Sequence, residues 1–218
     1  MNRVTLFVGE FGSGKTELAM NYALHLKEQG YKTAIVDLDV AKPYFRTREN
    51  SESLEAQGLK VVAPERRLSN SDLPILPPEL SRVLSDDTYY VVIDIGGGEA
   101  AVVLGQFRHK LFDLHPEILM VVNTRRPFTS SREGIISTLN RIETASGLSI
   151  TGFISNTNIG LETSAEHVNE GIQLTAAVAQ ELSLPLVMAV VPEWLDGKVQ
   201  LEVPTFILRP CTRYPWME

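Results

Sequence analysis

The stretch from Gly9 to Thr16 reads GEFGSGKT and decides the fold. It matches Gly-x-x-x-x-Gly-Lys-Thr and lies between an apolar run, Val4 to Val8, and an amphipathic stretch. Glycines let the chain curl so that successive backbone N–H groups point at an anion, at the positive end of the following helix. We therefore predict a phosphate-binding loop (P-loop), whose residues are Gly9, Glu10, Phe11, Gly12, Ser13, Gly14, Lys15 and Thr16. The alternative is a flexible glycine turn between two elements.

Two side chains of this loop carry the predicted chemistry. Lys15 is expected to contact the β and γ phosphates of a nucleotide, and Thr16 to offer its hydroxyl to Mg²⁺. A nucleotide and Mg²⁺ are therefore the expected ligands.

Short apolar runs alternate with helical patterns along the chain, which is typical of a parallel sheet covered by helices. We predict a three-layer α/β fold over one domain, residues 1–218, with a mostly parallel sheet of about seven strands and helices on both faces. Strands are predicted at 3–8, 33–37, 60–63, 90–94, 117–122, 150–155, 186–191 and near 203–208. Helices are predicted at 15–29, 131–146 and 163–182, and a proline-containing covering loop at 64–79.

Composition excludes several classes of protein. The formal net charge of −7 and the acidic stretch 151–200 argue against a protein that coats nucleic acid. Cys211 is the only cysteine, so one chain holds no internal disulfide and no Cys-x-x-Cys metal clip. With no signal-peptide pattern and no apolar run of about 20 residues, we expect a cytoplasmic protein without a membrane partner.

Acidic residues follow two of the predicted strands. Asp37 and Asp39 end the second strand, and we favour Asp39 for contact with Mg²⁺ or the attacking water and Asp37 for holding the loop or the metal's water shell. The alternative is that both cap a turn before Pro43. Asp94 ends the predicted strand 90–94 within the sequence VVIDIGGGE of residues 91–99, where a buried strand would deliver a carboxylate to a water on Mg²⁺.

Basic residues near these acids have open interpretations. Arg46 and Arg48 are candidates to contact a γ phosphate or a partner's carboxylate, and solvated surface arginines are the alternative. Arg125 and Arg126 are candidates to receive an anionic substrate or a protein partner, or are exposed loop charges.

Taken together, the P-loop, the DLD of residues 37–39 and the glycine-rich segment after Asp94 resemble the MinD/ParA group of SIMIBI-class P-loop ATPases. They are similar also to the CobQ/CobB-type nucleotide-binding halves of diamide synthases and to CooC-type metal-insertion ATPases. The resemblance implies ATP and Mg²⁺ as cofactors, with Asp39 as the switch aspartate and Asp94 as the Walker B acid. It further implies that Asn156 reads the purine base and that Pro192 and Glu193 flank adenine or ribose.

One departure from that group bears on catalysis. Its members carry a signature lysine after the first P-loop glycine, which reaches across a dimer, and this chain has Glu10 there. Unless Lys42, Arg46 or Arg48 substitutes, the resemblance then implies slow turnover or activation by a partner. Metal-insertion relatives use paired cysteines, so a chain with Cys211 alone is not predicted to load a metal.

Two functions fit the sequence. The first is a slow ATPase that acts as a nucleotide-dependent switch for an unidentified protein partner, with a homodimer as one candidate assembly. The second is an ATP-dependent small-molecule ligase or kinase resembling dethiobiotin synthetase. The DLD segment and the glycine-rich segment favour the switch.

Overall fold

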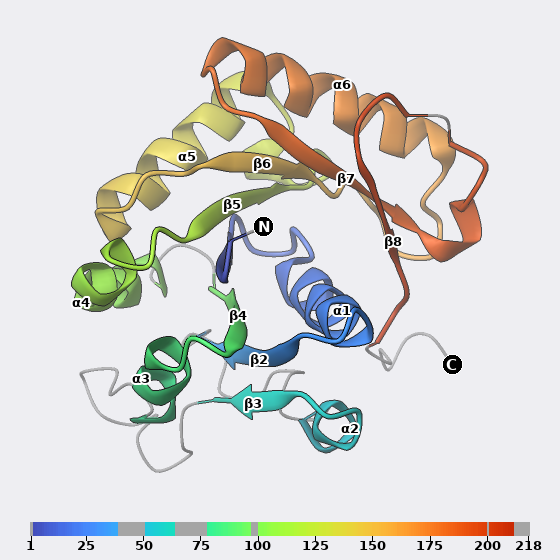
Figure 1. Cartoon of the computed structure of the whole chain (residues 1–218). Helices are drawn as coiled ribbons and strands as arrows, with labels where there is room; N and C mark the ends of the chain where they lie inside the picture. The colour runs from blue at the N-terminus through green and yellow to red at the C-terminus, as the bar shows by residue number, and fades with distance from the viewer. Residues whose placement is uncertain (1, 39–50, 64–77, 97–99, 200, 212–218) are drawn as a thin grey trace.

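Eight parallel strands form one sheet in the computed structural model, which describes residues 2–38, 51–63, 78–96, 100–199 and 201–211. The strand order is β3-β2-β4-β1-β5-β6-β7-β8 (Figure 1). The strands are β1 (Val4–Val8), β2 (Lys32–Asp37), β3 (Lys60–Val62), β4 (Tyr89–Asp94), β5 (Glu117–Val122), β6 (Gly152–Ser155), β7 (Leu186–Pro192) and β8 (Thr205–Leu208). The predicted α/β fold with a mostly parallel sheet is confirmed, with eight strands rather than about seven.

Helices cover both faces of the sheet. The helix α1 (Lys15–Glu28) lies in the hollow of the curled sheet, and four others cover the outer face (Figure 1). These four are α3 (Pro78–Ser85), α4 (Ala100–Phe112), α5 (Arg132–Ser146) and α6 (Ala165–Glu181). A short helix, α2 (Ser51–Ala56), contacts β3. No helix in the described ranges combines the length and the apolarity that a membrane crossing requires.

A large hydrophobic core lies on each face of the sheet. On the α1 side, Leu18, Met20 and Leu26 pack against sheet residues such as Phe7 and Val92. Alternate residues of the same strands face the outer helices, where the core contains, among others, Leu6, Val36, Ile93, Leu104, Leu139 and Val178. Strands buried on both faces read as nearly continuous apolar runs, which is why the sequence shows them clearly.

Three helices were not predicted from the sequence. α2 has six residues, too few to show a helical period, and α4 begins directly after the glycine-rich segment. α3 begins at Pro78, which corrects the end of the predicted loop 64–79; residues 64–77 lie outside the described residues. Proline suits the first turn of a helix because the N–H that it lacks has no partner there.

The topology places the predicted loop at the point where the strand order reverses. β1 lies between β4 and β5. The strand that follows β1 in the chain, β2, lies beyond β4, whereas β6, β7 and β8 extend beyond β5 on the other side. In open parallel sheets, ligands bind beside the carboxyl ends of the strands at such a point. The segment after Val8 therefore lies where this fold binds ligands.

Close packing of α6 also shapes this end of the sheet. A Cβ at Gly171 would lie 2.1 Å from Oγ1 and 2.3 Å from Cβ of Thr157, in the segment that follows β6. A Cβ at Gly105 in α4 would meet only backbone oxygens, at 3.6 and 3.7 Å.

We expect Gly171→Ala to lower the free energy of unfolding by about 1–2 kcal/mol, because overpacking outweighs the gain in helix propensity. Gly105→Ala, the matched control, is expected to raise it by up to about 1 kcal/mol. Urea denaturation followed by circular dichroism measures both. Equal effects of the two substitutions would contradict the close approach at Thr157.

Candidate functional site

The loop between β1 and α1 has the backbone of a phosphate cradle. Gly14 caps α1 in the left-handed region, with φ of 85°, and a Cβ there would lie 2.4 Å from Nδ2 of Asn156. At Gly9, with φ of 144°, a Cβ would lie 2.5 Å from the carbonyl oxygen of Val121. Both glycines are therefore required by conformation and by packing. The loop directs backbone N–H groups and a helix N-terminus to one place, which suits an anion.

Lys15 lies inside this loop. Its side chain is buried, and Nζ donates to the carbonyl oxygen of Glu10 at 2.8 Å and to Oγ of Ser13 at 3.4 Å. The ammonium group is thus directed to the centre of the loop, where a polyphosphate would be held.

Thr16 and Asp94 meet at the carboxyl ends of β1 and β4. Oγ1 of Thr16 donates to Oδ2 of Asp94 at 2.5 Å, and Asp94 is only 2% exposed. Asp37 is the register partner of Asp94 in β2, so the two carboxylates share the α1 face of the sheet. Asp39 lies outside the described residues.

These oxygen atoms fit Mg²⁺. The ion prefers hard oxygen ligands and is commonly held by one or two protein groups together with waters and substrate phosphates. A hydroxyl and a carboxylate in direct contact supply those groups. In the part of the chain that the structure describes, no three His, Cys, Asp or Glu side chains gather into a metal cluster.

At the position of the missing signature lysine, the Glu10 side chain contacts other residues of the chain. Its carboxylate pairs with Arg141 of α5, and its Oε1 accepts from the backbone N–H of Phe11 at 3.2 Å. The Phe11 side chain is 63% exposed. Lys42, Arg46 and Arg48, the candidate substitutes, lie outside the described residues.

Two residues after β5 brace the loop from the other side. Nε of Arg126 donates to the carbonyl oxygen of Gly12 at 2.9 Å. The fully buried Asn123 donates to the carbonyl oxygens of Asn158 and Gly12, at 2.9 and 3.5 Å. Arg126 therefore belongs to the site, whereas Arg125 pairs with Glu170 of α6 at the surface.

Asn156 links the P-loop to the segment after β6. Its Nδ2 donates to the carbonyl oxygen of Ser13 at 2.7 Å, and the side chain is buried. Its backbone oxygen accepts from Nδ2 of Asn158 at 2.8 Å. The interaction with Ser13 fixes the loop and places the Asn156 amide beside a pocket that adjoins the loop.

A pocket of about 100 Å³ opens next to Gly14 and Asn156. Its volume suits a flat ring rather than a whole nucleotide, and the P-loop adjoins it. Its other lining residues include Glu17, Asn158, Pro192, Trp194, Leu208 and Pro210. Pro192 thus lines this pocket, whereas Glu193 is not among its lining residues, and Oε2 of Glu193 lies 3.9 Å from Nε of Arg209.

Several residues of this site had no signal in the sequence. Asn123 follows an apolar strand directly, as Asn156 does, but the resemblance that pointed to Asn156 did not extend to it. Glu17, Leu208 and Pro210 had none, because their role depends on contacts between opposite ends of the chain. For Trp194 the sequence allows either a contact surface or a core role; it lines the pocket and donates from its ring nitrogen to the carbonyl oxygen of Thr163 at 3.2 Å.

Known structures share this architecture. The cell division protein FtsY from Thermotoga maritima matches with a TM-score of 0.62 at 20% identity, over 88% of this chain and 62% of that one. Chloroplast FtsY from Physcomitrella patens matches with a TM-score of 0.58 at 20% identity, over 87% of this chain and 58% of that one. The chain therefore shares the α/β fold of these FtsY structures. At this identity the matches show the fold alone and do not single out the MinD/ParA group.

The chain also matches a known protein in sequence. The signal recognition particle 54 kDa protein of Sulfolobus acidocaldarius is 28% identical over 127 residues, which cover 55% of this chain and 28% of that protein. No protein-family model matches the chain. The chain spans less than two thirds of the length of these FtsY structures and of the Sulfolobus protein.

Asn156 offers a direct test of how the loop is held. We expect Asn156→Ala to lower the free energy of unfolding by about 1–3 kcal/mol, because the Ser13 carbonyl loses its buried donor. Asn156→Asp should cost more at neutral pH, since a carboxylate would face that carbonyl oxygen. The excess cost should shrink at acid pH, where the introduced carboxyl is protonated and can donate.

Urea denaturation of both variants at pH 7.5 and pH 4, each compared with the wild type, measures these differences. Asparagine at this position makes no contribution to the loop if both variants unfold like the wild type.

Proposed function

We propose that this protein is a Mg²⁺-dependent nucleoside triphosphatase of the SIMIBI class that acts as a nucleotide-dependent switch for a protein partner. The observation that carries the proposal is the joint geometry of the loop: Lys15 directed into it and Thr16 in contact with Asp94 at its base. These are the groups that bind a triphosphate and its metal ion.

Each group has a defined part in binding. Backbone N–H groups of the loop and the N-terminus of α1 hold the phosphate oxygens, and Lys15 neutralises the β and γ phosphates. The Thr16 hydroxyl and the Asp94 carboxylate would hold Mg²⁺ and its waters. The ion supplies charge that offsets the negative charge of the phosphates.

Hydrolysis is proposed to be slow. Glu10 stands where the MinD/ParA group has its signature lysine, and its carboxylate pairs with Arg141. A cation supplied by a partner would then accelerate hydrolysis, as arginine fingers do by factors on the order of 10³–10⁵. Asp39 is proposed to orient the attacking water.

A protein partner would contact exposed aromatic side chains beside the loop. Phe11 and Phe128 are 63% and 62% exposed, and the Arg141 guanidinium lies 5.9 Å from the centre of the Phe128 ring. Aromatic and arginine side chains are favoured in protein interfaces. The partner is a second copy of the chain or a different protein, and we propose that the encounter takes place in the cytoplasm.

Adenine is the proposed base, as in the MinD/ParA group. Oδ1 of Asn156 can accept from the adenine amino group beside the loop. Guanine instead presents adjacent N–H donors that a carboxylate would suit. Of the lining residues that the structure describes, only Glu17 carries a carboxylate, and that carboxylate accepts the backbone N–H of Cys211.

The ligase or kinase alternative needs an acceptor site next to the γ phosphate. A larger cavity, of about 560 Å³, lies along the later turns of α1, from Asn21 to Glu28. At a rise of 1.5 Å per residue, those turns begin roughly 8 Å or more along the helix axis from the loop. Within the described residues, this cavity therefore lies apart from the loop, which supports the switch.

Calorimetry with ATP and Mg²⁺ tests the function. We expect the wild type to bind ATP and to release phosphate slowly, on the order of 10⁻⁴–10⁻² s⁻¹. Lys15→Ala should abolish binding, because the phosphates lose their cation. Thr16→Ala should remove the dependence of affinity on Mg²⁺, whereas Thr16→Ser, which keeps the hydroxyl, should preserve it.

The proposal fails if the wild type shows no heat with any purine triphosphate, or if Lys15→Ala binds as tightly as the wild type.

Base preference is measured separately, by competition of ATP and GTP at fixed Mg²⁺. We expect ATP to bind at least about tenfold more tightly than GTP, because one hydrogen bond satisfied or lost at a buried amide changes affinity by about that factor. A preference for GTP would overturn the assignment of adenine and leave the phosphate site intact.

A further inference from the structure

The chain returns to α1 after its last strand. Residues Leu208–Cys211, here called the strap, run from the end of β8 across the first turns of α1. The backbone N–H of Arg209 donates to Oδ1 of Asn21 at 2.9 Å, and the backbone N–H of Cys211 donates to Oε1 of Glu17. Two side chains one helical turn apart thus hold the strap by its backbone.

Asn21 is the centre of this arrangement. Its Nδ2 donates to the backbone carbonyl of Glu17 at 2.9 Å and to Sγ of Cys211 at 3.3 Å, while its Oδ1 accepts from Arg209. The side chain is buried, and the separation in sequence from Arg209 is 188 residues. An amide with both ends engaged fixes the position of the strap on the helix.

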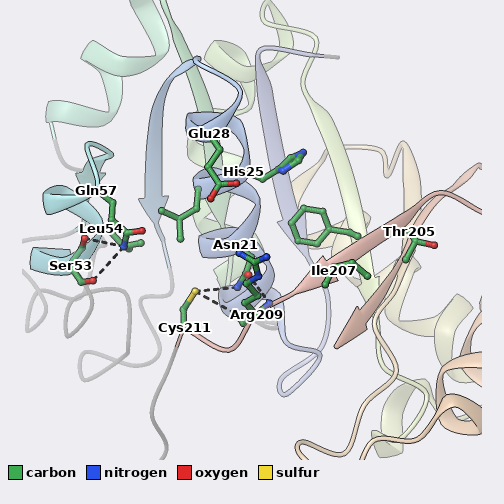
Figure 2. A pocket seen from close by; sticks show the side chains of 12 residues that line it. Asn21, His25, Glu28, Ser53, Leu54, Gln57, Thr205, Ile207, Arg209 and Cys211 are labelled. Atoms are coloured by element: carbon green, nitrogen blue, oxygen red, sulfur yellow. Dashed lines mark hydrogen bonds between the residues drawn. The ribbon is translucent and has the colours of Figure 1, made fainter. Parts of the chain in front are cut away.

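The strap separates two pockets. Leu208 and Pro210 line the pocket of about 100 Å³ beside the P-loop. Arg209 and Cys211 line the larger cavity, of about 560 Å³, on the other side (Figure 2). This alternation follows from extended backbone, in which successive side chains point to opposite faces.

The larger cavity lies in the opening of the curled sheet. Its walls come from α1, from α2 near one edge of the sheet, and from β8 at the other edge (Figures 1 and 2). Its volume is within the range of small-molecule sites. The lining residues are Asn21, Leu24, His25, Glu28, Ser53, Leu54, Gln57, Thr205, Phe206, Ile207, Arg209 and Cys211.

We propose that the strap couples nucleotide binding to the state of this cavity: a purine against Leu208 and Pro210 holds the strap on α1, and a group that fills the cavity beside Cys211 displaces it and weakens nucleotide binding. This inference rests on the proposed function. It makes the strap a movable part of the nucleotide pocket lining, and it makes the larger cavity a second site that changes nucleotide affinity.

The coupling has a short physical route. Glu17 directly follows Thr16 in α1, so the residue that holds Cys211 adjoins the residue proposed to hold Mg²⁺. Coupling between two sites is reciprocal: whatever factor the cavity applies to nucleotide affinity, the nucleotide applies to the cavity. Both directions are therefore measurable.

Cys211 is a native probe of the strap, because it is the only cysteine in the sequence. Burial raises the pKa of its thiol to about 11, and the nearby Glu17 carboxylate adds to this effect. The thiol should therefore react slowly with 5,5′-dithiobis(2-nitrobenzoate) at pH 8, and faster whenever the strap leaves α1.

The first experiment follows release of thionitrobenzoate from the whole chain with and without Mg·ATP. We expect ATP to slow labelling about five- to tenfold. Protein already carrying the thionitrobenzoate group on Cys211, which places an aromatic carboxylate in the cavity, should bind ATP with a Kd about five- to tenfold higher. Reduction with dithiothreitol should restore the original Kd.

The second experiment removes the hydrogen bonds of the Asn21 side chain to the strap without changing the nucleotide pocket, which Asn21 does not line. Asn21→Ala should speed labelling of Cys211, raise the Kd for ATP about fivefold and lose the protection by ATP. Asn21→Asp, which keeps an oxygen to accept from Arg209, should recover part of that protection. Lys27→Ala, an exposed change on the same helix, is the matched control and should behave as the wild type.

The outcomes separate the two proposals. Wild-type protein that does not bind nucleotide overturns the proposed function and this inference together. Protein that binds ATP normally but shows equal Cys211 labelling with and without ATP, and an unchanged Kd after labelling, overturns the inference alone. Because the labelling experiment uses the wild-type chain, it tests the inference even if Asn21→Ala does not fold.

Discussion

The hydrogen bond from Nδ2 of Asn156 to the carbonyl oxygen of Ser13 joins the two halves of the site. It connects the loop after β1 to the segment after β6, two strands away in the sheet. The left-handed turn at Gly14 leaves room for that amide and no room for a Cβ. The proposed phosphate and base sites therefore share one contact, because a shift of either segment would move the other.

Features that depend on neighbouring residues could be predicted from the sequence, whereas contacts between distant segments could not. Continuous Val and Ile runs predicted the central strands, and the GKT motif placed Lys15 and Thr16, since both signals lie within a few residues. α4 was missed because its sequence, AAVVLGQFRHKLF, lacks a clear alternation of apolar and polar faces. Neither Asn21 nor Arg209 marks the strap, because their contact exists only after the eight strands have assembled.

The acidic residue Glu10 lies within a loop that is proposed to bind an anion. The matched FtsY structures establish the architecture, and the departure from the MinD/ParA pattern lies at one position inside the loop. A carboxylate so close to a polyphosphate would repel it if left alone. Arg141 of α5 pairs with Glu10, so the loop keeps its positive character through Lys15 and the helix N-terminus.

The curl of the sheet gives α1 a position that a flat sheet would not. β8 and β3 form opposite edges, yet α2, which contacts β3, and the strap that follows β8 both line a cavity built on α1 (Figure 1). The same helix begins at the P-loop. A change at either edge can thus reach the phosphate site through one rigid element, without passing through the sheet. Because packed elements shift between discrete arrangements rather than deform continuously, α1 and its strap form a suitable two-state unit for the proposed nucleotide switch.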